Sequence, residues 1–131
     1  MTRAPDTVGE IMTREVVTVS PEDIVEHAVR AMVEHDIGSV VVADGDLALG
    51  LFTERDLTRR ILDQPDLLKR PVKDVMSSPV VATKPDAQMV EAFDLMNAEN
   101  VRRLAVVESD RLVGIVTERD LMKWVGAVAA E

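Results

Sequence analysis

An internal duplication constrains the fold of this chain more than any other feature. Shifting the sequence by 64 positions superimposes residues 8–57 on residues 72–121 without a gap. The run from Thr53 to Leu57 recurs unchanged from Thr117 to Leu121, which is a very improbable coincidence in so short a chain. The duplication therefore predicts one structural unit used twice. We expect the repeats at residues 8–61 and 72–125, joined by a proline-containing linker at residues 62–71.

The first copy has the pattern of a βαββα unit. A β-branched run, Val16–Val19, precedes a helix whose predicted start has Ser20 as N-cap and Pro21 in the first helical position. Two apolar strands follow, joined through Asp44–Asp46, where Asp-Gly favours a tight hairpin. A second helix is expected from Glu54 to about residue 63. The fold class predicted for the chain is α/β (α+β), with two βαββα repeats packed as an intramolecular pseudo-twofold pair.

The second copy repeats this plan with weaker local signals. Its first helix is expected over Asp86–Ala98, but Lys84 is a poor N-cap, so the helix should start with help from Thr83 or from packing. Its hairpin, Glu108–Arg111, lacks the glycine of the first copy and predicts a longer turn. A terminal helix that contains Leu121–Val125 has an apolar side that needs a partner surface.

The composition disfavours several classes of partner. A formal net charge of −9 argues against a nucleic-acid binder, because that affinity depends on Lys and Arg that neutralise phosphates. The few aromatic residues cannot easily build a stacking platform for single strands. No apolar run approaches the roughly 20 residues of a membrane helix, and the start lacks the apolar stretch of a secretory signal. We expect a cytoplasmic protein that contacts neither nucleic acid nor membrane.

Catalysis and metal binding are also disfavoured. Without cysteine the chain has no disulfide and no thiolate metal site. His27 and His35 lie eight positions apart on one predicted helix, with no second ligand pair nearby. No nucleophile stands at a recognisable spacing from a base. We expect no enzyme, no metal and no catalytic cofactor.

The most informative motif ends the last strand of each copy. It reads Gly-h-h-Thr-Glu-Arg-Asp, where h is apolar, over Gly50–Asp56 and Gly114–Asp120. A helix start offers unpaired N–H groups and a positive dipole end that suit a phosphate. The threonine hydroxyl can donate to a phosphate oxygen, and the carboxylate can accept both hydroxyls of a ribose. The glycine lets another group approach the strand closely.

The same motif has a second interpretation, which is that Thr and Asp form a capping box for their own helix. Taken alone, capping is the favoured interpretation. Both copies, however, keep Glu, Arg and Asp while the surrounding surface has diverged, and capping does not require the arginine. Arg55 and Arg119 are therefore included among the candidate ligand-binding residues.

These features resemble a tandem pair of cystathionine-β-synthase (CBS) domains, over nearly all of residues 8–121. The resemblance is carried by the Ile11-Met12-Thr13 and Val75-Met76-Ser77 openings, Pro21 and Pro85, the strands beginning near Ile37 and Val101, and the two Gly-h-h-Thr-x-x-Asp endings. It implies a regulatory ligand: AMP, ADP, ATP, S-adenosylmethionine or NAD. The ligand would lie in a cleft between the repeats, and its binding would change how they pack or contact a partner.

The resemblance also implies roles for individual residues. Asp56 and Asp120 would bind ribose hydroxyls, and Thr53 and Thr117 would lie near ribose or phosphate. Adenine would be held by backbone and apolar side chains near Val19, Thr83, Ile37 and Val101, with Thr18 and Ala82 in the same neighbourhood.

Arg102 and Arg103 replace Gly38 and Ser39 of the first copy. Basic residues there often reach phosphates in CBS domains, which would make the two sites unequal. An equally favoured interpretation is that both arginines only form ion pairs with acidic residues at the surface.

The functional hypothesis is a non-enzymatic sensor that binds an adenine nucleotide and, by analogy with standalone CBS pairs, forms a homodimer. The alternative is a ligand-independent interaction or stress-associated scaffold, in which the Thr-x-x-Asp motifs only cap helices.

Overall fold

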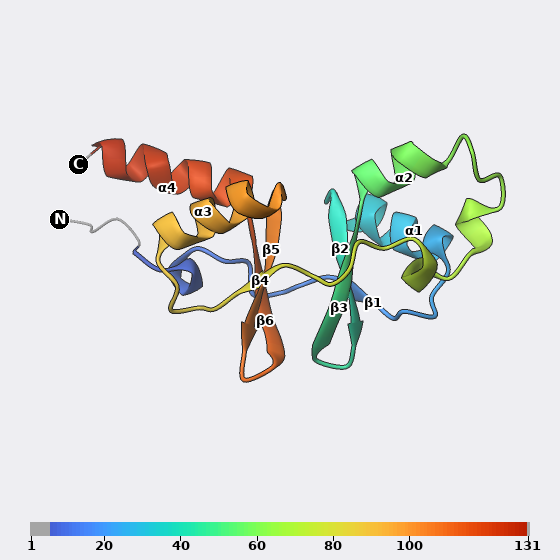
Figure 1. The fold of residues 1–131 in the computed structure, drawn as a ribbon, viewed down its shortest axis with the longest axis horizontal. Helices are drawn as coiled ribbons and strands as arrows, with labels where there is room; N and C mark the ends of the chain where they lie inside the picture. Colours follow the sequence, from blue (N-terminus) through green and yellow to red (C-terminus); the bar gives the residue numbers. More distant parts are fainter. Residues whose placement is uncertain (1–5, 131) are drawn as a thin grey trace. The chain divides into compact units, whose positions relative to one another are not determined.

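The computed structural model describes residues 6–130, which form two compact units (Figure 1). Residues 16–80 make the middle unit, whereas the terminal unit joins the segment before residue 16 to the segment from residue 81 onward. The sequence repeats begin near residues 8 and 72, ahead of these limits. The opening of each repeat therefore belongs to the unit that the other repeat builds.

Each unit contains the predicted βαββα order. The middle unit contains β1 (Thr18–Val19), α1 (Val25–His35), β2 (Ser39–Asp44), β3 (Leu47–Thr53), α2 (Glu54–Arg60) and the short 3-10 helices η2 (Leu67–Lys69) and η3 (Val72–Asp74). The terminal unit contains η1 (Val8–Glu10), β4 (Ala82–Thr83), α3 (Met89–Glu99), β5 (Arg103–Glu108), β6 (Arg111–Thr117) and α4 (Glu118–Ala130). The α+β fold of two repeats is thus confirmed.

Both sheets have the same topology. In the middle unit β2 pairs in parallel with β1 and antiparallel with β3, and α1 makes the crossover between the parallel strands. In the terminal unit β5 pairs likewise with β4 and β6, with α3 as the crossover. Each unit has its own hydrophobic core, which contains the fully buried Phe52 in the middle unit and the fully buried Leu104 in the terminal unit. The last strand of each sheet runs directly into a helix, which is where the candidate motif lies.

The predicted start of the first helix is wrong. α1 begins at Val25 with Ile24 as N-cap, four residues after Ser20. Ser20 instead closes a turn, because its N–H donates to Asp23 Oδ2 at 2.9 Å and its carbonyl accepts from the Asp23 N–H at 3.0 Å. Ile24 forms an antiparallel β-bridge with Pro71, just before η3. This pairing holds Ile24 in an extended conformation, so the helix begins only after it.

The second copy repeats this correction. α3 begins at Met89 rather than Asp86, with Gln88 as N-cap, so neither Thr83 nor Lys84 starts the helix. The Gln88 N–H donates to Glu91 Oε1 at 3.3 Å, and Gln88 forms a bridge with Thr7. In both copies the N-cap residue of the helix thus pairs with the residue just before an exchanged opening segment, which is Pro71 for Ile24 and Thr7 for Gln88.

Both hairpins are two-residue turns. The β2–β3 turn consists of Gly45, at φ 60°, and Asp46, so the tight hairpin predicted there is confirmed with the glycine in the first turn position. The β5–β6 turn consists of Ser109 at φ 51° and Asp110 at φ 64°. The longer turn predicted for the second copy is wrong, because both residues adopt left-handed conformations without a glycine.

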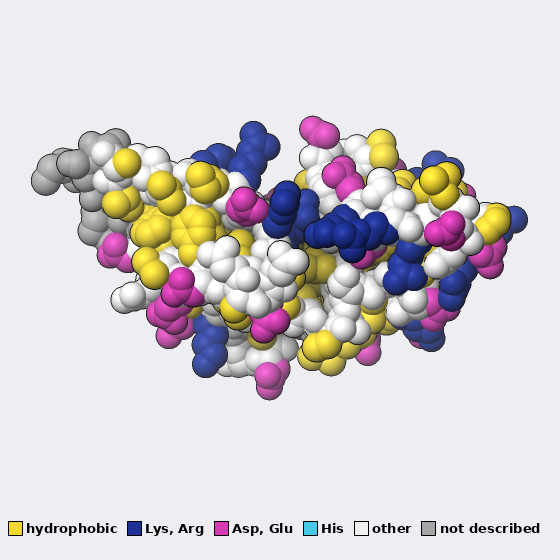
Figure 2. Space-filling model, turned by 45° about the horizontal axis from the view of Figure 1, so that its top comes forward, with side chains coloured by type: hydrophobic (Ala, Val, Ile, Leu, Met, Phe, Trp, Pro, Cys, Tyr) yellow, Lys and Arg dark blue, Asp and Glu magenta, His cyan; other side chains and the backbone are white. Residues whose placement is uncertain are grey.

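The terminal helix finds part of its partner surface within its own unit. The Trp124 ring lies 6.0 Å from that of Phe93, centroid to centroid, at an interplanar angle of 46°. Other apolar side chains on α3 and α4 stay exposed, and Figure 2 shows hydrophobic side chains gathering over these helices. The exposed ones are Val90, Met122, Val125 and Val128. Among the helices of residues 6–130, none combines the length and the apolar character needed to cross a bilayer.

Candidate functional site

The start of α2 is a complete capping box. Thr53 is the N-cap, and its Oγ1 accepts a hydrogen bond from the Asp56 N–H at 3.2 Å. In return the Thr53 N–H donates to Asp56 Oδ2 at 2.9 Å, and the Thr53 hydroxyl donates to the same oxygen at 3.1 Å. Two backbone amides that a helix start leaves unpaired are thereby satisfied.

The start of α4 has the same reciprocal bonds. The Thr117 N–H donates to Asp120 Oδ2 at 2.9 Å, and the Asp120 N–H donates to Thr117 Oγ1 at 3.2 Å. The capping role of both Thr-x-x-Asp motifs is thus confirmed. Each carboxylate uses one oxygen for it, so any second role rests on the other oxygen.

The second carboxylate oxygen distinguishes the two copies. Asp56 Oδ1 accepts a hydrogen bond from the Ser77 hydroxyl at 3.2 Å. The residue equivalent to Ser77 in the other copy is Thr13, and within residues 6–130 Asp120 has hydrogen bonds with Thr117 alone. Sequence reasoning missed Ser77 as a partner of the acid, although it belongs to the opening that carries the family resemblance.

The glycines of the motif face the exchanged opening segments. A Cβ on Gly50 would lie 2.7 Å from both Met76 Sδ and the Ser77 carbonyl oxygen. On Gly114 it would lie 2.5 Å from Met12 Sδ and 3.0 Å from the Thr13 carbonyl oxygen. The group predicted to approach the strand closely is therefore the chain itself.

The four candidate arginines differ in their surroundings. Arg102 forms an ion pair with Glu118, with 3.6 Å between Nε and Oε2, and its side chain is 78% exposed. Arg103 is half-buried and lies directly opposite Thr117 in the β5–β6 pairing. Arg55 and Arg119 are exposed, one residue before the acid of each motif. Pairing with a surface acid, one of the two roles considered for Arg102 and Arg103, is thus observed for Arg102.

The residues expected near adenine lie at the edges of the two cores. Val19 is buried and belongs to the core of the middle unit. Ile37 and Val101 are half-buried and pack against the middle and terminal cores, respectively. Thr83 is half-buried at the end of β4.

The structure sorts the candidates by unit. Val19, Ile37, Thr53, Arg55 and Asp56 belong to the middle unit, and Thr83, Val101, Arg102, Arg103, Thr117, Arg119 and Asp120 belong to the terminal unit. Thr and Asp meet within each motif, and Arg103 stands opposite Thr117 in the register of the terminal sheet. A cleft between the repeats stays a prediction.

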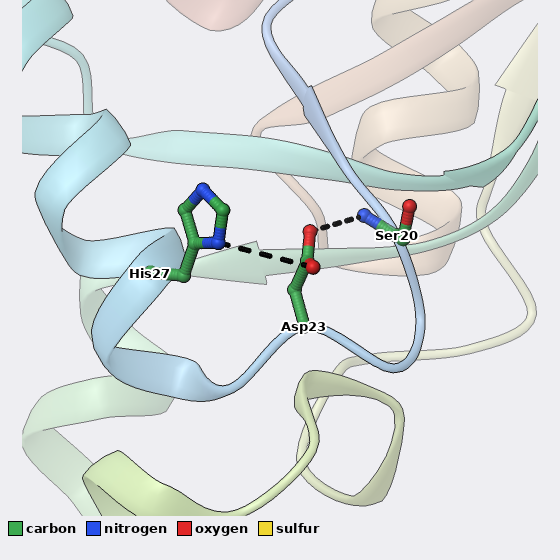
Figure 3. A network of polar contacts seen from close by, with 3 residues as sticks. All are labelled: Ser20, Asp23 and His27. Carbon is green, nitrogen blue, oxygen red and sulfur yellow. Dashed lines mark hydrogen bonds and ion pairs between the residues drawn. The ribbon is translucent and has the colours of Figure 1, made fainter.

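The histidine of α1 takes part in a local polar network. His27 Nδ1 lies 3.8 Å from Asp23 Oδ1, while the other oxygen of Asp23 accepts from the Ser20 N–H, as Figure 3 shows. His27 thus faces the turn that precedes its own helix. Within the described part of the chain, no group of three or more His, Asp or Glu residues is placed to hold a metal ion.

Comparison with known proteins identifies the repeated unit. The model of the CBS domain matches residues 8–63 and again residues 72–127. The CBS domain-containing protein YhcV of Bacillus subtilis is 35% identical over 87% of this chain and 81% of its own length. The uncharacterized protein MK0525 of Methanopyrus kandleri is 38% identical over 88% of this chain, and the match spans 61% of that protein.

Solved structures share the fold. The crystal structure of the CBS-domain containing protein ATU1752 from Agrobacterium tumefaciens superimposes with a TM-score of 0.86 at 31% identity. The match covers 95% of this chain and 97% of that chain.

Proposed function

Because the chain belongs to the CBS domain family, we propose that it is a regulatory module that binds an adenosine-containing ligand at the starts of α2 and α4. Pairs of this domain generally bind adenosyl ligands in a regulatory role. The candidate ligands are AMP, ADP, ATP, S-adenosylmethionine and NAD, which share an adenosine with vicinal ribose hydroxyls. Binding that ribose is the requirement that the site has to meet.

The proposal depends on the different roles of the two oxygens of the Asp120 carboxylate. Oδ2 is held by the Thr117 N–H, which fixes the carboxylate relative to the backbone. Oδ1 has no hydrogen bond within residues 6–130. An ionised carboxylate oxygen offers two acceptor positions, so Oδ1 can accept from a ribose without disturbing the cap. The capping box orients the acid in advance.

Groups suited to a phosphate adjoin the same helix start. Thr117 Oγ1 accepts from the Asp120 N–H, and its own hydroxyl hydrogen stays available for donation. The positive end of the α4 dipole favours an anion at this position. Arg103, directly opposite Thr117, supplies a cation on the same face of the sheet, because paired residues of neighbouring strands project to one side. Arg102, held by Glu118, adds a second cation nearby.

The proposed module is a sensor rather than a catalyst, and we place it in the cytoplasm. A ligand that binds one arrangement of the module more tightly than another shifts the population toward that arrangement. A partner that recognises the favoured arrangement then responds to the ligand concentration. The alternative is the ligand-independent scaffold, which the capping boxes favour because they explain Thr and Asp without a ligand.

Thermal unfolding with AMP, ATP, S-adenosylmethionine and NAD distinguishes the two functions. A ligand at 100 times its Kd adds about 2.7 kcal/mol to the free energy of unfolding, whereas a scaffold is not stabilised. The Asp120→Asn variant should lose this stabilisation while keeping most of its stability without ligand, because asparagine retains a side-chain acceptor for the cap. Asp94→Asn, on the exposed face of α3, is the matched control. Equal ligand binding by Asp120→Asn and the parent would overturn the role of Asp120.

We further propose that the module forms a homodimer through the exposed apolar side chains of α3 and α4. Val90, Met122, Val125 and Val128 make up this surface, and covering it removes apolar area from water. Sedimentation equilibrium of the parent should give twice the mass of one chain. A Val125→Glu variant should sediment as a single chain, and Lys123→Gln on the same helix, which lowers the net charge by the same amount, is the charge-matched control.

A further inference from the structure

We propose that Ser77 makes the two copies of the site unequal by occupying the acid of the middle unit, so that the ligand binds first at Asp120. This inference rests on the proposed function and concerns the selectivity of that same site. It starts from one position in the repeat, where Ser77 of one copy corresponds to Thr13 of the other.

The backbone holds both residues in the same way. The Ser77 N–H and carbonyl pair with Leu51 at 2.8 Å and 3.0 Å, and those of Thr13 pair with Ile115 at 2.9 Å each. The two hydroxyls therefore start from equivalent positions beside the motif. Only the Ser77 hydroxyl donates to the acid, at 3.2 Å from Asp56 Oδ1.

At the first copy, both oxygens of the acid and the threonine hydroxyl take part in hydrogen bonds. Asp56 Oδ2 accepts from the Thr53 N–H and hydroxyl, and Asp56 Oδ1 accepts from Ser77. The Ser77 hydroxyl takes one of the two acceptor positions of Oδ1, so a ribose that needs both must displace it. Within residues 6–130, the corresponding Asp120 oxygen and Thr117 hydroxyl hydrogen have no partner to displace.

The two copies also differ in the residue that lies opposite the motif threonine. Arg103 faces Thr117 across the sheet, whereas the residue that faces Thr53 is Ser39, which is buried and uncharged. A ligand that carries a phosphate therefore gains a cation opposite the threonine at the second copy, in addition to the motif arginine that both copies have. Hydroxyl competition at one copy and added charge at the other both direct the ligand to Asp120.

Equilibrium dialysis with AMP tests the inference through stoichiometry. The parent and Asp56→Asn should bind one AMP per chain in the same concentration range, and Asp120→Asn should not bind in that range. Ser77→Ala should bind a second AMP, with the affinity of the Asp56 site raised by about tenfold, the factor expected for one hydrogen bond to a charged group. Adding Asp56→Asn to Ser77→Ala should remove that second AMP.

Thr13→Ala is the matched control, because it removes the equivalent hydroxyl, which has no hydrogen bond with Asp120, and should leave stoichiometry and affinity unchanged. The backbone bonds of Ser77 and Thr13 persist in both alanine variants, so both proteins should fold. Two equal AMP sites in the parent, or loss of AMP binding in Asp56→Asn, would overturn the inference and leave the proposed function standing. Absence of AMP binding from every protein would overturn the inference, and the adenine-nucleotide panel then decides the proposed function separately.

Discussion

Gly50 lies so close to Ser77 that a Cβ built on the glycine would come within 2.7 Å of the Ser77 carbonyl oxygen. Two backbone hydrogen bonds between Leu51 and Ser77 hold the segments at this separation. The contact attaches the opening of the second repeat to the last strand of the first. Its counterpart joins Gly114 to Thr13, and the motif glycine therefore serves the exchange of openings between repeats.

Alanine at either motif glycine should destabilise the protein. Gly50→Ala and Gly114→Ala each force a methyl group against backbone and a methionine sulfur, and overpacking of this kind costs about 1–3 kcal/mol. Gly126→Ala is the control, because Gly126 lies within α4 with no atom near its Cβ position, and alanine there should add about 0.5–1 kcal/mol. Urea unfolding measures all three. Unchanged stability of Gly50→Ala would contradict the close approach.

The capping boxes predict a second set of stability changes. Thr53→Ala and Thr117→Ala should each lower the free energy of unfolding by about 1 kcal/mol, the usual cost of a lost N-cap. Thr58→Ala on α2 is the control, since its exposed hydroxyl bonds only to the Arg55 carbonyl. It should change stability by less than about 0.5 kcal/mol. Equal losses at Thr53 and Thr58 would argue against the cap.

The sequence predicted the order of helices and strands because the residues within each element indicate its type. Apolar periodicity marks the helices, β-branched runs mark the strands, and the Asp-Gly pair marks the first hairpin. The identical Thr-x-x-Asp motifs likewise predicted the helix starts at Glu54 and Glu118. These signals are contained within a few residues and do not depend on the rest of the chain.

What the sequence could not predict depends on contacts between distant segments. Ser20 and Pro21 are a sound helix start by local rules, but Ile24 is held extended by its bridge to Pro71. The hydrogen bond between Ser77 and Asp56 spans 21 positions and has no counterpart at Thr13. A serine and a threonine at matched positions gave no local reason to expect different partners for the two acids.

The second hairpin should accept a stabilising glycine. Asp110 is not a glycine but has a φ of 64°, in the left-handed region. This conformation is unfavourable for residues with a side chain and nearly free of strain for glycine. Asp110→Gly should therefore raise the free energy of unfolding, by less than the roughly 1–2 kcal/mol that the left-handed conformation costs an ordinary L-residue, because aspartate tolerates it better than most. Gly45→Ala in the first hairpin provides the reverse change and should lower stability, although its Cβ position is open. Thermal unfolding of the two variants should shift in opposite directions.

The contact between Trp124 and Phe93 should support the last helix. Trp124 is half-buried against the terminal core, so Trp124→Ala should cost about 2 kcal/mol, less than the loss of a fully buried ring. Trp124→Phe keeps an aromatic ring beside Phe93 and should cost less than half as much. Lys123→Ala, exposed one position earlier, controls for changes in helix propensity. Urea unfolding followed by far-UV circular dichroism measures the series, because Trp124 is the sole tryptophan and its fluorescence is lost in two variants. If Trp124→Ala were as stable as Lys123→Ala, the ring would contribute nothing to the core, and α4 would be held by its capping box and by the buried Leu121.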